Sequence, residues 1–277
     1  MSSDVTGPTP VEALVRRERV VVVAGLISIT ALAWWWLLSG AGTGMSVMAM
    51  TTWSFPPPIH SSLVEDWSPV YAILMFLMWW IMMIAMMTPS AAPVILLYAR
   101  AYRYEQKSGK IGAGVAPTQS FLWGYLVSWM AFSAAATCLQ WGLERAGLVH
   151  AMLMWSIDTV FSAGLLIAAG LYQFSSLKNA CLAQCRSPAQ FLAENFRSGV
   201  SGAFGMGFKH GLFCLGCCWA MMALLFVGGA MNLVWIAGLT ILVLIEKVSR
   251  AGRTIGHAAG IVMIAAGMWL LSSPYFG

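Results

Sequence analysis

The chain has 277 residues, of which 60% are hydrophobic and only 9% are charged. Roughly a quarter of the residues are charged in a soluble domain, so this composition excludes a soluble globular enzyme, a disordered protein and a nucleic-acid-binding protein. The net charge of +5 comes from fifteen Lys and Arg residues against ten acids. The length is sufficient for six to eight membrane-spanning helices of about 20 residues each.

Seven apolar segments predict an all-α, polytopic transmembrane bundle with about seven spanning helices. The first segment follows a basic stretch, as in a signal peptide, but its apolar run is too long for one, so we expect a retained helix. We therefore expect a cytosolic tail at 1–19 and a single transmembrane domain at 20–277. In chain order, the segments cover residues 20–38, 69–99 (interrupted near Pro89 and Pro93), 120–143, 150–174, 207–227, 231–245 and 255–271.

Two connections between these segments are long. The connection at 39–68 is expected outside the cytosol, and that at 175–206 inside it. In the inner one, Ser187 followed by Pro188 and Gln190 is typical of a helix start and predicts a short interfacial helix at 188–196. The outer one contains residues that suit either Cu(I) capture or an interfacial apolar patch, namely Met45, Met48, Met50 and His60.

The distribution of basic residues predicts the orientation of the chain. With a cytosolic N-terminus, fourteen of the fifteen cations face the cytosol and only Arg145 lies outside, as the positive-inside rule requires. The C-terminal residues 272–277 are then extracytosolic. The fourteen are Arg16, Arg17, Arg19, Arg100, Arg103, Lys107, Lys110, Lys178, Arg186, Arg197, Lys209, Lys247, Arg250 and Arg253.

Five of the six cysteines and one histidine lie within 38 residues. Cys181 and Cys185 are four residues apart and share one face of a helix. His210, Cys217 and Cys218 are three or four residues from Cys214, which places these four residues on one side of another helix, near its cytosolic start. A structural disulfide is not expected in the reducing cytosol, so neighbouring thiols suggest a soft metal ion or redox chemistry. The alternative is packing as small apolar side chains, and the spacing is not a zinc signature. The six residues are Cys181, Cys185, His210, Cys214, Cys217 and Cys218.

The second apolar segment is rich in methionine at its cytosolic end. Thioethers are soft ligands suited to Cu(I), although Met is also a common flexible apolar filler. If this segment packs against the cysteine-rich one, thioethers meet thiols at the same depth, and Cu(I) becomes the expected ion. The candidate thioether ligands are Met82, Met83, Met86 and Met87.

Asp158 is the only acid well inside an apolar segment. An intramembrane carboxylate is costly unless it is paired, so we expect it to face the bundle interior. Its expected role is that of a proton site, a hard metal ligand or a hydrogen-bond partner of Asn232, Gln140 or a Trp. Glu144 and Glu246, each followed by a cation, are expected at the membrane interface.

Two blocks of the chain resemble an uncharacterised bacterial family described only as predicted metal-binding integral membrane proteins. The first block runs from Met78-Trp79 through Met82-Met83 and Met86-Met87 to Pro93. The second runs from Cys181 and Cys185 through His210-Gly211 and Cys214-Leu215-Gly216-Cys217-Cys218 to Glu246-Lys247. The resemblance implies a multi-pass protein of the bacterial cytoplasmic (inner) membrane with a metal site. It implies no reaction, and it suggests the cysteines and His210 as first-rank ligands and the methionines as second-rank ones.

Three functions are compatible with these features. The first is copper handling, as delivery, insertion or export, in which a metal-donor protein is the partner. The second is an accessory or assembly subunit of a larger membrane complex, with no metal of its own. The third is a membrane thiol enzyme that uses Cys217 and Cys218, but the absence of nucleotide-binding and hydrolase motifs makes an enzyme the less expected class.

Overall fold

The structure is a computed structural model that describes residues 10–43, 46–55, 67–109, 117–151 and 153–273. The described part is built from α-helices joined by turns and short connections. The helices are α1 (Pro10–Leu38), α2 (Val47–Met50), α3 (Pro69–Lys107), α4 (Thr118–Arg145), α5 (Thr159–Tyr172), α6 (Ser176–Arg186), α7 (Pro188–Asn195), α8 (Gly199–Ala223), α9 (Leu225–Gly228), α10 (Leu233–Val248) and α11 (Gly252–Ser272).

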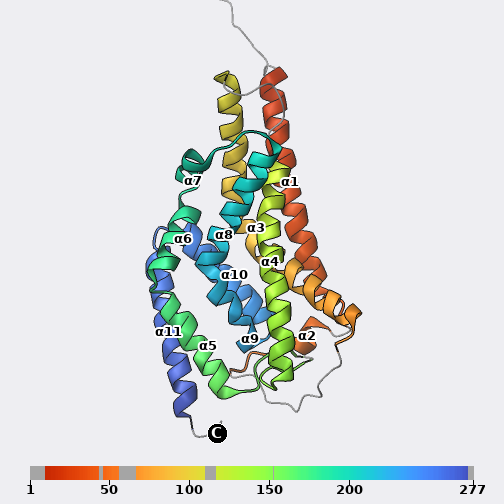
Figure 1. Ribbon diagram of the computed structural model, residues 1–277, viewed down its shortest axis with the longest axis vertical. Helices are drawn as coiled ribbons and strands as arrows, with labels where there is room; N and C mark the ends of the chain where they lie inside the picture. Colours follow the sequence, from red (N-terminus) through yellow and green to blue (C-terminus); the bar gives the residue numbers. More distant parts are fainter. Residues whose placement is uncertain (1–9, 44–45, 56–66, 110–116, 152, 274–277) are drawn as a thin grey trace, which may run out of the picture.

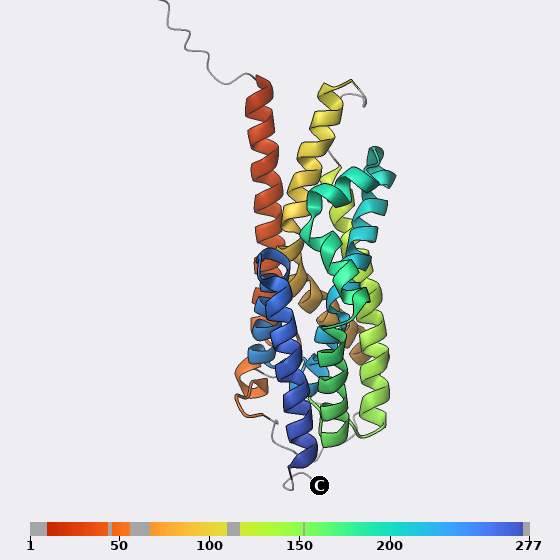
Figure 2. The ribbon, with the colours of Figure 1, turned by 90° about the vertical axis from the view of Figure 1, so that its left-hand side faces the viewer.

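The long helices run along one axis and form an elongated bundle (Figure 1). α1 packs against α3, α3 against α4, α4 against α8, and α5 against α11. Both views show the start of α1 and the end of α3 projecting beyond the other helices at the end of the bundle opposite to the C-terminus (Figures 1 and 2). The start of α1 and the end of α11 therefore lie at opposite ends of the bundle.

The all-α bundle predicted from the sequence is confirmed, and every one of the seven apolar segments contains a helix. The interruption predicted near Pro89 and Pro93 is wrong, because α3 continues through both prolines. Among the described residues, five helices are long and apolar enough to cross a membrane, and α5 with α6 would make a sixth span bent by 62°. α10 has 16 residues, which is about 24 Å at 1.5 Å per residue and less than a hydrocarbon core of about 30 Å. The number of seven spans therefore stays a prediction.

The fourth apolar segment begins later than predicted. Its helix starts at Thr159 instead of His150, because the Asp158 carboxylate accepts a hydrogen bond from the Phe161 amide at 2.5 Å and caps the helix. The expected position of Asp158 inside a helix was therefore wrong. Its recorded partner is a backbone amide, and the side chain is only partly buried.

The cytosolic connection predicted at 175–206 is largely helical. It contains α6, α7 and the first turns of α8, so that Cys181 and Cys185 lie on a helix and the other three cysteines lie in the middle of α8, not at its start. The short helix predicted at 188–196 is confirmed as α7. Its N-cap residue, Ser187, forms no side-chain capping bond, and the Gln190 amide donates to Glu194 instead of completing a capping box.

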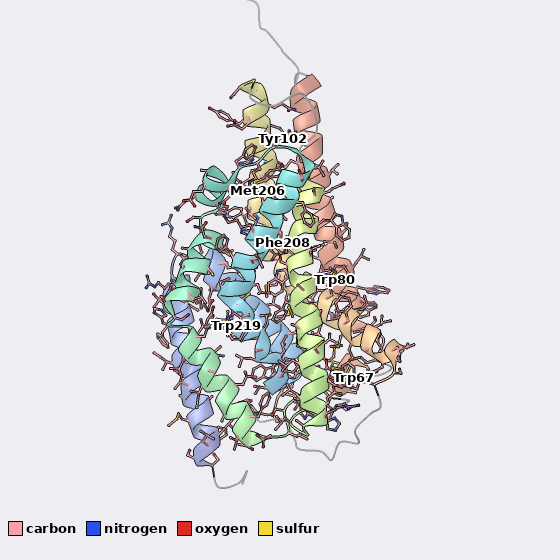
Figure 3. The ribbon with its side chains drawn as sticks, viewed as in Figure 1. Trp67, Trp80, Tyr102, Met206, Phe208 and Trp219 are labelled. Carbon is pink, nitrogen blue, oxygen red and sulfur yellow. The ribbon has the colours of Figure 1, made fainter. Side chains whose placement is uncertain are left out.

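Glu144 is buried, although the sequence placed it at the interface. Its carboxylate accepts hydrogen bonds from the Trp67 indole at 2.7 Å and the Gln140 amide at 2.8 Å, and the Gln140 oxygen accepts from the Trp79 indole at 2.7 Å. Figure 3 shows Trp67 near the lower end of the bundle, far from Tyr102 at the upper end. This polar network joins α4 to α3 and to Trp67, which lies two residues before α3, in an otherwise apolar setting.

Glycines allow α4 and α8 to approach each other closely. A Cβ atom at Gly207 would overlap the carbonyl oxygen of Phe121, and one at Gly124 would overlap that of Phe204. A Cβ at Gly211 would overlap the Ser128 hydroxyl. Small residues at helix contacts have this role in membranes, where packing rather than water exclusion drives association.

Replacement of Gly207 by Ala tests this contact. We expect Gly207→Ala to destabilise the bundle by about 1–3 kcal/mol, because the methyl group must push α4 and α8 apart. Gly205→Ala is a matched control, since a Cβ there meets nothing within 4 Å and Ala favours a helix over Gly. Thermal unfolding in detergent compares the two, and equal melting temperatures would contradict a tight contact at Gly207.

Candidate metal site

Sulfur atoms from three helices meet where α3, α6, α8 and α10 come together. Cys214, Cys217 and Cys218 project from one side of α8, as their spacing of three and four residues predicts, and each is only 1% exposed. α6 contributes the half-buried Cys185, and α3 contributes Met87. The cysteines therefore have the shared face and the neighbouring methionine helix predicted from the sequence.

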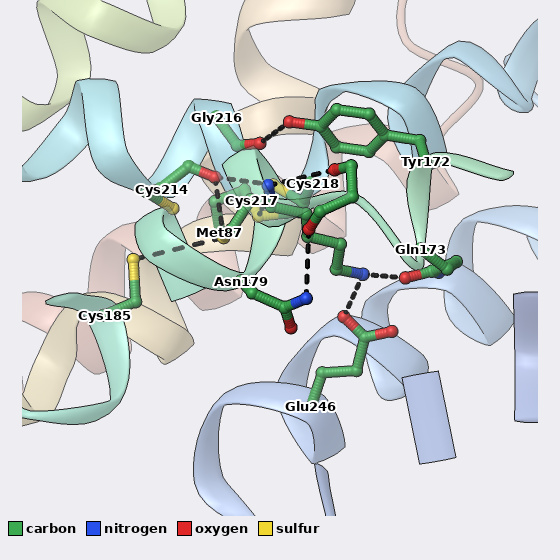
Figure 4. Close-up of polar contacts among 12 residues, drawn as sticks. Met87, Tyr172, Gln173, Asn179, Cys185, Cys214, Gly216, Cys217, Cys218 and Glu246 are labelled. Carbon is green, nitrogen blue, oxygen red and sulfur yellow. Dashed lines mark hydrogen bonds and ion pairs between the residues drawn. The ribbon is translucent and has the colours of Figure 1, made fainter. Parts of the chain in front are cut away.

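Two sulfur–sulfur distances connect the helices. The Sγ atoms of Cys185 and Cys217 are 4.0 Å apart, and the Cys218 Sγ lies 4.0 Å from the Met87 Sδ (Figure 4). A disulfide bond is about 2.05 Å long, so all these thiols are free. A metal–thiolate bond to zinc is about 2.3 Å, and sulfurs 4.0 Å apart are therefore close enough to share one ion of similar size.

Local hydrogen bonds hold the thiols against α8. The thiols of Cys217 and Cys218 both donate to the Cys214 carbonyl oxygen at 3.0 Å. The Tyr125 hydroxyl donates to the Met87 carbonyl at 3.1 Å and also lies 3.1 Å from the Cys214 Sγ. The thiols of α8 are thus held by contacts within α8 and with Tyr125 of α4.

A buried cation lies beside these thiols. The Lys247 ammonium is 2.8 Å from the Cys214 Sγ and 3.1 Å from the Ser90 hydroxyl oxygen. The sequence treated Lys247 as one of the cytosolic cations, but its side chain lies inside the bundle, 8% exposed. Ammonium next to sulfur is a charge-assisted contact, and it makes α10 part of the site.

The preceding residue, Glu246, belongs to a separate ion pair. Its carboxylate lies 2.7 Å from the Lys178 ammonium, with side-chain exposures of 2% and 3%, and Lys178 also donates to the Gln173 side-chain oxygen. Figure 4 shows Glu246 and Gln173 on either side of this contact. The loop position expected for Lys178 was wrong, since it lies on α6. Glu246 is near the end of α10, as predicted, but both side chains are buried.

The two ends of α6 are attached to neighbouring elements. Lys178, near its start, reaches Glu246 of α10, and the Arg186 guanidinium, at its end, donates to the carbonyl oxygens of Ser249 and Arg250 at 2.8 and 3.2 Å. Its side also contacts α8, because a Cβ at Gly216 would lie 2.6 Å from the Cys181 Sγ. These contacts fix the position of Cys185 over Cys217.

The other predicted ligands are less closely associated with the sulfurs. His210 is buried among the rings of Phe121, Tyr125 and Phe191, and its Nδ1 has no hydrogen-bond partner among the described residues. Met82, Met83 and Met86 are buried on α3, whereas the recorded contact with a cysteine belongs to Met87. In the described ranges, no group of three or more His, Cys, Asp and Glu residues is arranged to hold a metal ion.

The outer methionines do not form a single feature. Met48 is 77% exposed, whereas Met50 is buried and its Sδ lies 3.9 Å from the Thr43 hydroxyl. Met45 and His60 lie outside the described residues. The described part of this loop therefore places its two methionines in different surroundings.

Sequence reasoning missed Lys247, Tyr125 and Ser90 as neighbours of the thiols. Only Lys247 could have been found from the sequence. The apolar segment before it is too short for a helix that crosses a bilayer and also leaves Lys247 in water. Tyr125 and Ser90 gave no such signal, since an isolated hydroxyl on an apolar helix is usually satisfied by its own backbone.

The buried ion pair leads to a prediction about stability. Lys178→Met leaves the Glu246 carboxylate buried without its cation and should destabilise the protein by about 3–5 kcal/mol. The double variant Lys178→Met/Glu246→Leu should recover most of this loss, because no unpaired charge remains. Unfolding of the purified variants in detergent measures both, and a double variant as unstable as the single one would contradict the argument.

The comparisons with known proteins agree with a metal-related function. Residues 76–270 match the family PpoB2, described as copper chaperone, and this range includes every one of the cysteines and methionines that meet at α8. No curated protein and no solved structure is detectably similar to the chain. Since the match covers well over half of its length, the chain belongs to the PpoB2 copper chaperone family.

Proposed function

We propose that the protein binds Cu(I) at the sulfur cluster of α3, α6 and α8 and passes it to an acceptor protein. The observation that carries this proposal is the meeting of α8 thiols with a thiol of α6 and a thioether of α3, each at 4.0 Å. Thiolates and thioethers are soft ligands that suit Cu(I) better than hard divalent ions. The description of the family supports copper as the ion.

The arrangement of the ligands suits an ion that is carried and then released. Cys185 lies on a short helix after a 62° bend, whereas Cys217 and Cys218 lie on a long one. A structural zinc site holds its ion in a closed tetrahedral set of four ligands. Here a bound ion would be shared between helices, so that movement of α6 removes a ligand and favours transfer.

In this proposal the protein is a multi-pass component of the bacterial cytoplasmic membrane, and the sulfur cluster in the middle of α8 is reached from the cytosolic side through α6. Fourteen of the fifteen cations lie on the same side of the predicted spanning segments, which supports a cytosolic N-terminus and an extracytosolic C-terminus. The opposite positions of the start of α1 and the C-terminus agree with it (Figure 1). Cysteines that are reached from the cytosol remain reduced and available to copper.

Metal analysis tests the copper site. Full-length protein from copper-supplemented cells, purified under reducing conditions, should carry about one copper ion per chain, because a shared thiolate site takes one ion. Cys185→Ser/Cys217→Ser should lose it while remaining folded and inserted, because it removes the two thiols at bridging distance. Cys138→Ser is the matched control, since Cys138 is an exposed thiol on α4, and its copper content should equal that of the wild type.

Two outcomes would contradict the proposal. Wild-type protein without a soft metal ion under these conditions would overturn it, and a membrane partner that co-purifies at fixed stoichiometry would then favour an accessory subunit. Equal copper in the double variant and the wild type would remove the Cys185–Cys217 pair from the site.

Reporter fusions test the orientation. A reporter that is active only outside the cytosol should be active after Gly277 and inactive in a truncated fusion after Gly109, because α3 ends among cytosolic cations. Activity after Gly109 would reverse the orientation. Inactivity after Gly277 alone would mean that the number of spans is even.

A further inference from the structure

We propose that Lys247 makes the sulfur cluster selective for a monovalent soft ion over a divalent one. This inference rests on the proposed function, because it concerns the ion that the same site takes. The ammonium acts through its fixed positive charge next to the ligands. It is a specificity-determining residue, not a ligand.

Ligand softness alone does not decide which ion binds. Thiolates bind Zn²⁺ at about 2.3 Å in many proteins, and they also suit Cu(I). Cysteine sulfur and methionine sulfur therefore separate soft from hard ions but leave the choice between Cu(I) and a thiophilic divalent ion open. A second property of the site has to make that choice.

The position of Lys247 supplies this property. Among the described residues its ammonium contacts the Cys214 Sγ and the Ser90 hydroxyl oxygen, and it forms no ion pair with a carboxylate. Glu246, the adjacent residue, lies 2.7 Å from Lys178 instead. The charge of Lys178 is thus balanced within its own pair, whereas the charge of Lys247 is available to the sulfur cluster.

The charge of the loaded site follows from these contacts. We take as the two ligating thiolates the pair at bridging distance, Cys185 and Cys217, which contributes two negative charges. The neutral thiols of Cys214 and Cys218 and the thioether of Met87 contribute none. A monovalent ion on two thiolates has a net charge of −1, which the ammonium brings to zero. A divalent ion on the same thiolates is already neutral, so the ammonium leaves a net charge of +1.

This difference is large because the site is buried. The three α8 cysteines are each 1% exposed, and a charge without a counter-charge is costly away from water. Interaction energies of close, desolvated charge pairs correspond to about tenfold or more in binding constants. Lys247 should therefore favour Cu(I) or Ag(I) and disfavour Zn²⁺ or Cd²⁺.

Competition experiments on the full-length protein in detergent, with reductant present, test the inference. Wild-type, Lys247→Met and Ser90→Ala proteins are equilibrated with Ag(I) and Cd²⁺ in the presence of a thiol competitor, and bound metal is counted by mass spectrometry. Lys247→Met should shift the ratio of Ag(I) to Cd²⁺ affinity towards Cd²⁺ by about tenfold or more. Ser90→Ala is the matched control, because it removes a contact of the ammonium but keeps the charge, and its ratio should stay that of the wild type.

The outcomes separate the inference from the proposed function. Wild-type protein that binds neither ion would overturn the copper site itself. Wild-type protein that binds Ag(I) and also retains stoichiometric Cd²⁺ would overturn only the role of Lys247, and this result does not depend on the folding of any variant. An unchanged ratio in a folded Lys247→Met protein would overturn it as well, whereas a preserved ratio in Lys247→Arg, which keeps the charge, would support it.

Discussion

The close contact between α4 and α8 is the constraint on which the rest of the site depends. Gly124, Gly207 and Gly211 remove the side chains that would keep these helices apart, and this fixes both the depth and the rotation of α8. The rotation then determines where its cysteines point, because residues three and four apart share a face. With α4 on one side of α8, the thiols face α3, α6 and α10, which supply a thioether, a thiol and an ammonium. A different rotation would direct the same thiols to the surface of the bundle, where the exposed Cys138 of α4 lies.

The apolar surroundings explain why the buried charges occur in sets. An isolated charge inside a bundle is costly, and two of the three buried charges next to α6 satisfy each other, since Lys178 pairs with Glu246 at 2.7 Å. The third, Lys247, has sulfur as its closest partner. A thiol balances a positive charge less well than a carboxylate does, so Lys247 is the charged group here with the weakest counter-charge nearby. A bound anionic metal–thiolate unit would be its natural counter-charge, which links the packing of α10 to the loading of the site.

The sequence was sufficient for the bundle and for the shared face of the α8 cysteines, but not for the neighbours of these thiols. Long apolar runs leave no alternative to helices in a membrane, and the cysteine spacing alone predicted a shared face. The boundary at Asp158 was wrong because hydropathy does not register a cap, and the carboxylate was mistaken for one inside a helix. Lys178 and Lys247 were counted with the solvated cations because a charge count cannot tell a loop residue from one that points back into the bundle. The contact of Met87, rather than Met82, Met83 or Met86, with a cysteine depends on the relative heights of α3 and α8, which no single helix specifies.

The break between α5 and α6 connects the fold with the handling of an ion. A continuous helix would carry Cys181 and Cys185 away along the α5 axis, whereas the 62° bend lays α6 across α8 and places Cys185 over Cys217. The cysteines of α8 are almost completely buried, and those of α6 are half-buried, so in the proposed function an acceptor thiol reaches the sulfurs of α6 first. The contacts of Lys178 and Arg186 with α10 and the residues after it hold α6 in place. Lys247 lies on the same α10 that contacts α6 through Glu246. In the proposed function, α10 therefore both supports the helix that carries Cys185 and supplies the charge that favours a monovalent ion.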